Sequence, residues 1–476
     1  MTDITIPPPP PSASPSSAVR RGATGPFYFA AWRWHFYAGL YVVPFLVVLA
    51  LTGLVMLWTS VLDGRDGENA FTVAAAGSPL AVSAQMQAVT TAFPQAPVVR
   101  YIAPRAAEGA AIFQIDRAGE AVMVAVDPYA GTVLGDWPRR SGWYDFASDV
   151  HGTLMLGTLG DRLIEIAAGF AVVLVVTGLY LWWPRGRHGV LRMLVPDFAA
   201  RGRPLWKSLH GVVGAWMSAI LVVFLLSGLS WSGVWGEKFT QAWSTFPAEK
   251  WDNVPLSDAT HAAMNHGTKQ VPWGLEQTPM PASGSQAGAP GIADGVPVDL
   301  QAVVDFARAS GFAGRMQVNM PSGETGVWTI SRDSMSNDSA DPTSDRTVHL
   351  DRFTGKVLAD VGYGDYAVPA RAMAVGVAFH EGDLGAWNVA LVTVFCLSVV
   401  FLSASGLVMW WKRRPAGVAR LVAPPVPDSL PMWKGAMALM LAVSMLFPLT
   451  GLTLIAVLAL DVLVIARLPG LRQAIG

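Results

Sequence analysis

The hydrophobic pattern of the chain is dominated by long runs that carry no charge. The 23 residues from 36 to 58 form the first of these runs. At about 1.5 Å per residue in a helix, such a run can cross a hydrocarbon core of about 30 Å. Comparable runs follow His151, His210 and His380. The pattern therefore predicts four membrane spans, within residues 27–59, 149–184, 209–235 and 373–411.

The four spans repeat one pattern twice. His35 precedes Gly53 by eighteen residues, and His210 precedes Gly228 by the same interval. The second and fourth spans also follow a histidine, and they match each other up to a late glycine. Each half of the chain thus contains a histidine-led span, a polar segment and a second histidine-led span. This arrangement indicates an internal duplication.

The polar segments between the spans, residues 60–148 and 236–372, have the pattern of α+β modules. Each contains one stretch typical of a helix, followed by short runs with the alternation and β-branched content of strands. Each then reaches an Asp-x-x-x-Gly turn, at residues 127–131 and 351–355. The predicted fold is an α-helical integral membrane protein with four core spans in two duplicated pairs, a C-terminal hydrophobic helix and two α+β modules.

Residues 236–296 of the second module have no counterpart in the first. This insertion contains His261, His266 and Met264, whose side chains can bind a metal or a substrate. Its Pro, Gly, Ser and Ala content favours a solvated, partly disordered loop instead.

Composition agrees with a membrane protein that carries sizeable soluble parts, because 52% of the residues are hydrophobic and 14% are charged. A net charge of -1 argues against a nucleic-acid partner. The single cysteine, Cys396, excludes an intramolecular disulfide, a cysteine-ligated iron–sulfur cluster and a CxxC redox pair.

Basic residues gather before the first span and in the short segments 185–208 and 412–432. The positive-inside rule makes these segments cytoplasmic loops, in a bacterial inner membrane with the two modules in the periplasm. The Pro-rich residues 1–26 are predicted to be a disordered cytoplasmic tail. Residues 433–468 are apolar but interrupted by Pro448, and we expect one kinked span there rather than two short passes.

The four span-end histidines carry the candidate chemistry. With this topology His35 and His210 lie at the cytoplasmic face, while His151 and His380 lie at the periplasmic face. If the halves pack as pseudo-twofold mates, the members of each pair face one another. Two neutral imidazoles on opposite sides of a planar macrocycle hold a six-coordinate haem suited to electron transfer. The basic residues near span ends are candidates to pair haem propionates, although topology alone also explains them: Arg33, Arg185, Lys207 and Lys412.

The electron donor is expected to be a separate molecule. No GxGxxG motif follows a predicted strand, and the cytoplasmic segments are too short for a nucleotide-binding domain. A membrane quinol or a separate cytoplasmic reductase would therefore supply electrons. Two other readings stay open. One is a metal or small-molecule transporter in which the span-end histidines bind the ion; intramembrane carboxylates would favour it, and only Glu165 and Asp461 qualify. The other is a non-enzymatic membrane sensor or anchor.

These motifs together resemble one known family. The H-x-x-x-G starts of the first and third spans, the span ends TGLYLWWPR and SGLVMWWKR, and the module ends DPYAGTVL and DRFTGKVL resemble PepSY-associated transmembrane proteins, over roughly residues 27–466. That family includes iron-regulated inner-membrane proteins and periplasm-facing ferric-siderophore reductases. The resemblance implies two periplasmic PepSY-like modules and an oxidoreductase with two haem b groups, which reduces a ferric siderophore and releases Fe(II). Its axial haem ligands would be His35, His210, His151 and His380. The insertion at 236–296 is where this chain departs from the family pattern.

Overall fold

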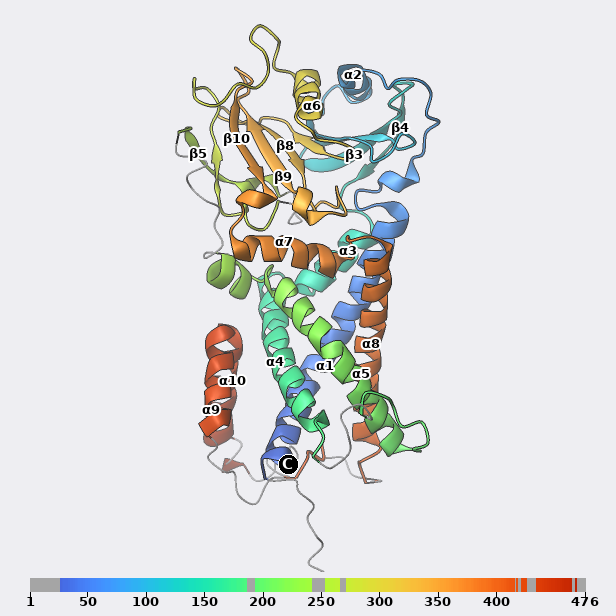
Figure 1. Cartoon of the computed structure of the whole chain (residues 1–476), viewed down its shortest axis with the longest axis vertical. Coiled ribbons are helices and arrows are strands. Elements are labelled where there is room, and N and C mark those ends of the chain that lie inside the picture. Colours follow the sequence, from blue (N-terminus) through green and yellow to red (C-terminus); the bar gives the residue numbers. More distant parts are fainter. Residues whose placement is uncertain are drawn as a thin grey trace, which may run out of the picture.

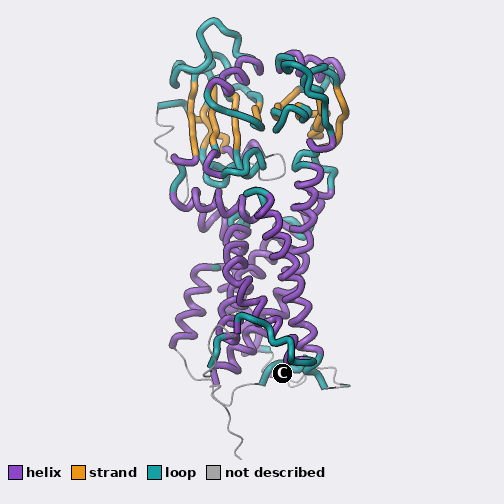
Figure 2. Tube along the Cα trace, turned by 45° about the vertical axis from the view of Figure 1, so that its right-hand side comes forward, coloured by secondary structure: helices purple, strands orange, loops and turns teal. Residues whose placement is uncertain are grey.

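The computed structural model describes residues 26–185, 193–241, 253–265, 271–415, 417, 421–425, 434–464 and 467–468. The predicted tail (all but its last residue) and His266 lie outside these residues. The molecule has two layers, a helical bundle and a β-sheet, with two short helices between them (Figure 1). Figure 2 shows the strands gathered at one end of the molecule. We call the end of the bundle next to the sheet the sheet end, and the other the far end.

Within the described residues, four helices are long and apolar enough to span a membrane, as predicted. They are α1 Pro26–Asp63, α4 Thr158–Trp182, α5 Arg203–Leu229 and α8 Ala386–Trp411. The chain is a multi-pass membrane protein. The 38 residues of α1 extend about 57 Å, well beyond the thickness of a hydrocarbon core, so α1 continues up to the sheet.

Two short helices, α3 Trp143–Thr153 and α7 Val368–Glu381, lie between the sheet and the bundle (Figure 1). The sequence pattern placed each of their histidines in one segment with the span that follows. In the structure, a turn separates α3 from α4, and another separates α7 from α8. After α7 the chain turns at Gly382, whose φ of 87° is the left-handed conformation that ends many helices. His151 and His380 therefore sit on helices of their own.

The two predicted modules share one antiparallel sheet of eight strands, in the order β10-β9-β8-β7-β1-β2-β3-β4. The halves join where β1 pairs with β7, with Tyr101 opposite Val318. The helices α2 Val82–Ala92 and α6 Leu300–Ala309 cover one face and close a core that includes Phe113. The strands are β1 Val98–Ile102, β2 Ala111–Arg117, β3 Glu120–Val126, β4 Val133–Pro138, β7 Gln317–Asn319, β8 Trp328–Arg332, β9 Arg346–Leu350 and β10 Val357–Gly362.

The described part of the insertion forms a small β-ribbon beside the sheet, not a solvated loop alone. Its strands β5 Leu256–Thr260 and β6 Pro279–Pro281 pair with each other. His261, which follows β5, is fully buried. The remaining short helical turns are η1 Glu68–Ala70, η3 Trp235–Thr240, η6 His261–Met264, η7 Pro342–Ser344 and η8 Tyr363–Asp365.

The C-terminal apolar stretch differs from the single kinked span that we expected. It forms two short helices, α9 Lys434–Leu446 and α10 Pro448–Leu463, which meet at Phe447. A Cβ on Gly451 would lie 2.8 Å from the Cβ of Ser444, whereas seven residues of one helix would separate these positions by about 10 Å. The chain therefore turns back at Phe447, because Pro448 cannot continue the hydrogen-bonded helix.

Candidate functional site

The structure pairs the four predicted histidines as the duplication suggests. At the far end, the ring centres of His35 on α1 and His210 on α5 are 6.4 Å apart, with the ring planes at 88°. At the sheet end, the rings of His151 on α3 and His380 on α7 are 6.3 Å apart, at 86°. Two equivalent sites thus exist, one near each end of the bundle. That these rings are haem ligands stays a prediction.

A hydroxyl group holds each of the four rings from a neighbouring span. His35 Nδ1 lies 3.0 Å from Thr177 Oγ1, and His151 Nδ1 lies 2.9 Å from Thr52 Oγ1. In the second copy, the partners are serines: His210 Nδ1 is 2.8 Å from Ser405 Oγ, and His380 Nδ1 is 2.9 Å from Ser227 Oγ. The same contact is therefore built four times.

These contacts fix which ring nitrogen carries the proton. Each hydroxyl donates its only proton to a carbonyl in the preceding helical turn, as Thr177 does to Val173 at 2.6 Å and Ser227 does to Val223 at 2.7 Å. Thr52 and Ser405 bond their helices in the same way. The hydroxyl oxygen is then an acceptor, so the ring donates through Nδ1–H. A neutral ring in this tautomer presents the lone pair of Nε2, which is the form that binds a metal.

A glycine follows each hydroxyl and lies next to the ring, and at Gly178 a side chain would crowd it. A Cβ on Gly178 would lie 3.1 Å from His35 Cε1, and a Cβ on Gly228 would lie 3.4 Å from His380 Cε1. Our reading of the sequence noted these glycines but missed the hydroxyls before them. The signal was present as Thr-Gly-Leu at 52–54 and 177–179, and as Ser-Gly-Leu at 227–229 and 405–407.

A third histidine pair in the same chain shows what a direct hydrogen bond between two rings looks like. His261 Nδ1–H donates to the carbonyl of Thr278, so its Nε2 accepts from His349 Nε2–H at 2.9 Å. The ring centres of that pair are 5.0 Å apart, against 6.4 and 6.3 Å in the two pairs beside the bundle. A metal about 2 Å from each of two facing nitrogens would separate ring centres by about 6 Å. The wider spacing thus fits one metal atom between the rings.

The surroundings of the four rings also fit a bulky planar group. Each ring is only partly buried, although each lies among packed helices. A Cβ on Gly152, beside His151, would meet no atom within 4 Å. The residues therefore fit a haem better than a small hydrated ion, which would need further oxygen ligands. Among the described residues, no cluster of three or more His, Cys, Asp or Glu side chains suits a metal ion alone.

The two sites lie at different depths. Along α1, seventeen residues separate His35 from Thr52, the partner of His151. This interval corresponds to about 26 Å of helix. Apolar side chains from α1, α5 and α8 fill the space beside the sheet-end site and between the sites, and Phe224 lies against both His380 and Phe395, with ring centres 4.6 and 4.2 Å away. The bundle interior between the sites is therefore apolar.

A buried ion cluster joins the two helices that carry the sheet-end pair. Arg65 lies just beyond α1. It donates to Glu381, the last residue of α7, at 2.9 Å, and to Asp383, two residues after α7, at 3.0 Å. Its guanidinium also lies 5.7 Å from the ring centre of Tyr144, on α3. Burial raises the pKa of Glu381 to about 7, against the opposing effect of Arg65. Arg65 thus connects α1, α3 and α7 and helps to set the position of His151 relative to His380.

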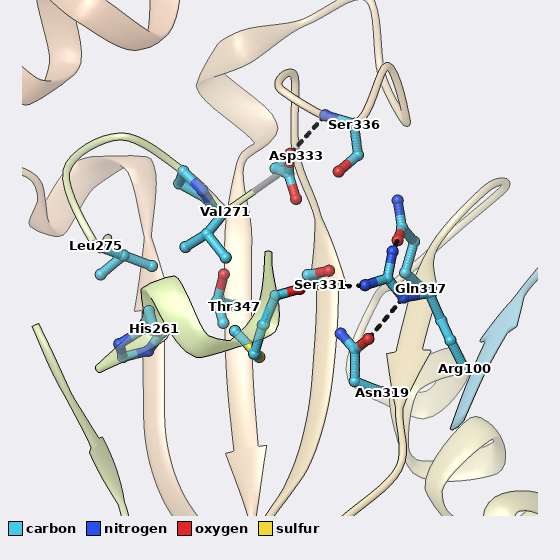
Figure 3. A pocket seen from close by; sticks show the side chains of 12 residues that line it. Arg100, His261, Val271, Leu275, Gln317, Asn319, Ser331, Asp333, Ser336 and Thr347 are labelled. Carbon is cyan, nitrogen blue, oxygen red and sulfur yellow. Dashed lines mark hydrogen bonds between the residues drawn. The ribbon is translucent and has the colours of Figure 1, made fainter. Parts of the chain in front are cut away.

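A polar cavity lies in the sheet layer, on the face opposite α2 and α6 (Figure 3). Arg100 points into it and donates to Asn319 at 2.7 Å and to Gln317 at 3.2 Å. His261 from the insertion also lines it, but its ring nitrogens already bond Thr278 and His349. The cavity is lined by residues of the sheet and the insertion, so we assign it no part of the four-histidine site.

The sequence was compared with known families and proteins. The family model described as PepSY-associated TM region matches residues 32–413, which is most of the chain. That range contains all four histidines and their four hydroxyl partners. No curated protein matches the chain.

Proposed function

The chain belongs to the PepSY-associated TM region family, and we propose that it is an oxidoreductase that carries electrons across the bacterial inner membrane with two b-type haems. The observation that supports this most directly is the fourfold contact between a ring Nδ1–H and a Ser or Thr hydroxyl. It leaves the Nε2 lone pairs available in two ring pairs, one near each end of the bundle.

The chain's own residues would hold and insulate the cofactors. His35 with His210, and His151 with His380, would each hold the iron of one haem through Nε2. When bound, such haems supply reversible one-electron chemistry between Fe(III) and Fe(II). The hydroxyls keep the rings in the metal-binding tautomer, and the apolar interior of α1, α5 and α8 excludes water from the space between the sites.

The proposed acceptor is a ferric siderophore in the periplasm, reduced by one electron so that iron leaves as Fe(II). The donor is a membrane quinol or a separate cytoplasmic reductase. Support for this direction comes from the family and from the distribution of basic residues, which are concentrated at the far end of the bundle. The PepSY-like sheet then stands on the periplasmic side, above the His151–His380 site.

Glu165 is the buried carboxylate of the four spans within the described residues, and its contacts give the transporter alternative little support. Glu165 accepts backbone N–H groups of Val234 and Trp235, at 3.1 and 3.2 Å. It therefore caps the segment after α5 rather than facing either histidine pair.

The first test is to purify the protein in detergent from haem-replete cells, count haem per chain, and record oxidised and dithionite-reduced spectra. We expect two b-type haems per chain with six-coordinate, low-spin spectra. A colourless protein would refute the proposal. Mixing the reduced protein with a ferric hydroxamate and an Fe(II) chelator under anaerobic conditions then tests the acceptor. Stable reduced haem in that mixture would reject siderophore reduction while leaving the haem assignment intact.

A further inference from the structure

Two arginines at the far end of the bundle repel each other electrostatically, and within the described residues neither forms an ion pair. Arg203 is the first residue of α5, and Arg413 follows α8 by two residues. Burial lowers the pKa of the Arg413 guanidinium, and the positive charge of Arg203 lowers it further. The Nε atoms of both side chains are buried and lack a hydrogen-bond partner among the described residues. Two like charges with unsatisfied donors are costly unless an anion joins them.

Arg413 is held in place by groups that do not neutralise it. It donates to the carbonyl of Val422 at 2.5 Å. Its guanidinium lies over the rings of Trp32 and Phe36, 5.1 and 5.4 Å from their centres. These two aromatic residues flank His35 on α1, three residues before it and one after. Arg413 is therefore fixed beside the helix that carries one of the far-end histidines.

Arg203 and Trp182 lie on two other helices, α5 and α4, near the far-end side of His210. Arg203 precedes His210 by seven residues, which is almost two turns, so both lie on one face of α5 about 10 Å apart along the axis. Trp182 ends α4, and its Cδ1 would lie 3.3 Å from a Cβ on Gly211, next to His210. Its indole N–H is also buried without a partner among the described residues. Three helices thus bring unsatisfied donors to the far edge of one histidine pair.

The chain offers few carboxylates to satisfy these donors. From 26 to 62 the sequence has no acidic residue, from 183 to 213 it has only Asp197, and from 384 to 460 it has only Asp428. Asp197 accepts the backbone N–H of Ala199, within its own turn. At the sheet end, by contrast, Arg65 already has Glu381 and Asp383 as partners. Within the described residues the far-end donors have no carboxylate partner, so they suit an added anion.

We propose that Arg203, Arg413 and the Trp182 indole form an anion site at the far edge of the His35–His210 pair, and that its ligand is the pair of propionate carboxylates of the haem held there. This inference rests on the proposed function. Arginine binds a carboxylate through two parallel hydrogen bonds, which favours a fixed carboxylate ligand. The earlier expectation that Arg33, Arg185, Lys207 or Lys412 pairs the propionates stays a separate prediction.

The test isolates the far-end site with a His380→Ala background and compares two porphyrins. Protein from haem-deficient cells is titrated with haem b and with its dimethyl ester, which has the same ring but no carboxylates. We expect the parent to bind haem about tenfold or more tightly than the ester, and Arg203→Gln/Arg413→Gln to lose that preference. The double variant should also lower the midpoint potential, because fewer positive charges then stabilise the reduced iron.

Arg201→Gln is the matched control, since Arg201 is an exposed arginine two residues from Arg203. It should behave as the parent does. Arg203→Lys keeps the positive charge and should retain part of the preference for haem over the ester. Its binding distinguishes loss of the anion site from a failure to fold. If this parent binds one haem with a preference over the ester but the double variant matches Arg201→Gln, this inference is wrong and the proposed function stands. If the parent binds haem and ester equally while phosphatidylglycerol stabilises it only when both arginines are present, the site belongs to lipid and the inference is also overturned. A parent without haem would refute the proposed function itself.

Discussion

The hydroxyl of Thr177 is the most informative single group to remove. Thr177→Val keeps the branched shape of the side chain but deletes the oxygen that lies between His35 Nδ1, at 3.0 Å, and the carbonyl of Val173, at 2.6 Å. Thr177 is 5% exposed, so water cannot readily replace the hydroxyl. The substitution leaves the ring donor of His35 without its acceptor and removes the contact that selects its tautomer.

The size of the effect follows from the cost of an unsatisfied buried donor. Such a group costs about 1–3 kcal/mol, and each 1.4 kcal/mol changes an equilibrium constant about tenfold. Loss of a hydrogen bond behind a metal ligand weakens metal binding by about 10–100-fold. We therefore expect haem at the far-end site to bind about 10–100-fold more weakly in Thr177→Val. Binding at the sheet-end site, which uses Thr52 and Ser227, should not change.

The assay is a haem titration of protein from haem-deficient cells, with low-spin absorption and electron paramagnetic resonance spectra as a second readout. Thr177→Ser restores a hydroxyl and should restore binding. Thr393→Val is the matched control, because Thr393 bonds the carbonyl of Val389 at 2.8 Å in the same way but holds no histidine in the structure. If Thr177→Val bound both haems with parental affinity and spectra, the proposed role of the hydroxyls would be refuted.

Three further predictions concern the histidines themselves. His35→Ala and His210→Ala should each abolish the same haem and leave the other, measured by haem content and spectra; loss of both haems from either variant would contradict the pairing. His266→Ala should leave haem content unchanged, and loss of a haem there would move one site into the insertion. Burial lowers the pKa of His261 to about 4, from 6.5. Between pH 4 and pH 6.5 the unfolded chain binds a proton at His261, whereas in the folded chain the His261 ring, paired with His349, stays neutral. The contribution of this pair to folding stability is therefore complete above pH 6.5 and is lost as the pH falls toward 4. Proteolysis of the insertion should therefore speed up from pH 7 to pH 5, and an unchanged rate would count against the buried pair.

Much of the fold could be predicted from local pattern because membrane spans depend on local properties. A helix satisfies its own backbone hydrogen bonds, so an uncharged run of sufficient length is enough to indicate a span. The structure confirms this for α1, α4, α5 and α8 within the described residues. The sheet was harder to predict, since strand partners depend on distant residues. The pairing of β1 with β7, which joins the two modules, left no signal in either strand alone.

The candidate site also combines features set by local sequence with features set by distant residues. The four histidines and their duplication could be predicted from the chain alone, because equal spacing along helices places equivalent residues at equivalent depths. The contacts of Thr52, Thr177, Ser227 and Ser405 could not, because each of them meets a ring from another helix, up to 195 residues away. Helix packing also places Arg413, rather than its neighbour Lys412, beside the far-end pair, where Trp32 holds its guanidinium. Spacing in a sequence fixes which residues share a helix face, but the packing of helices fixes which faces meet.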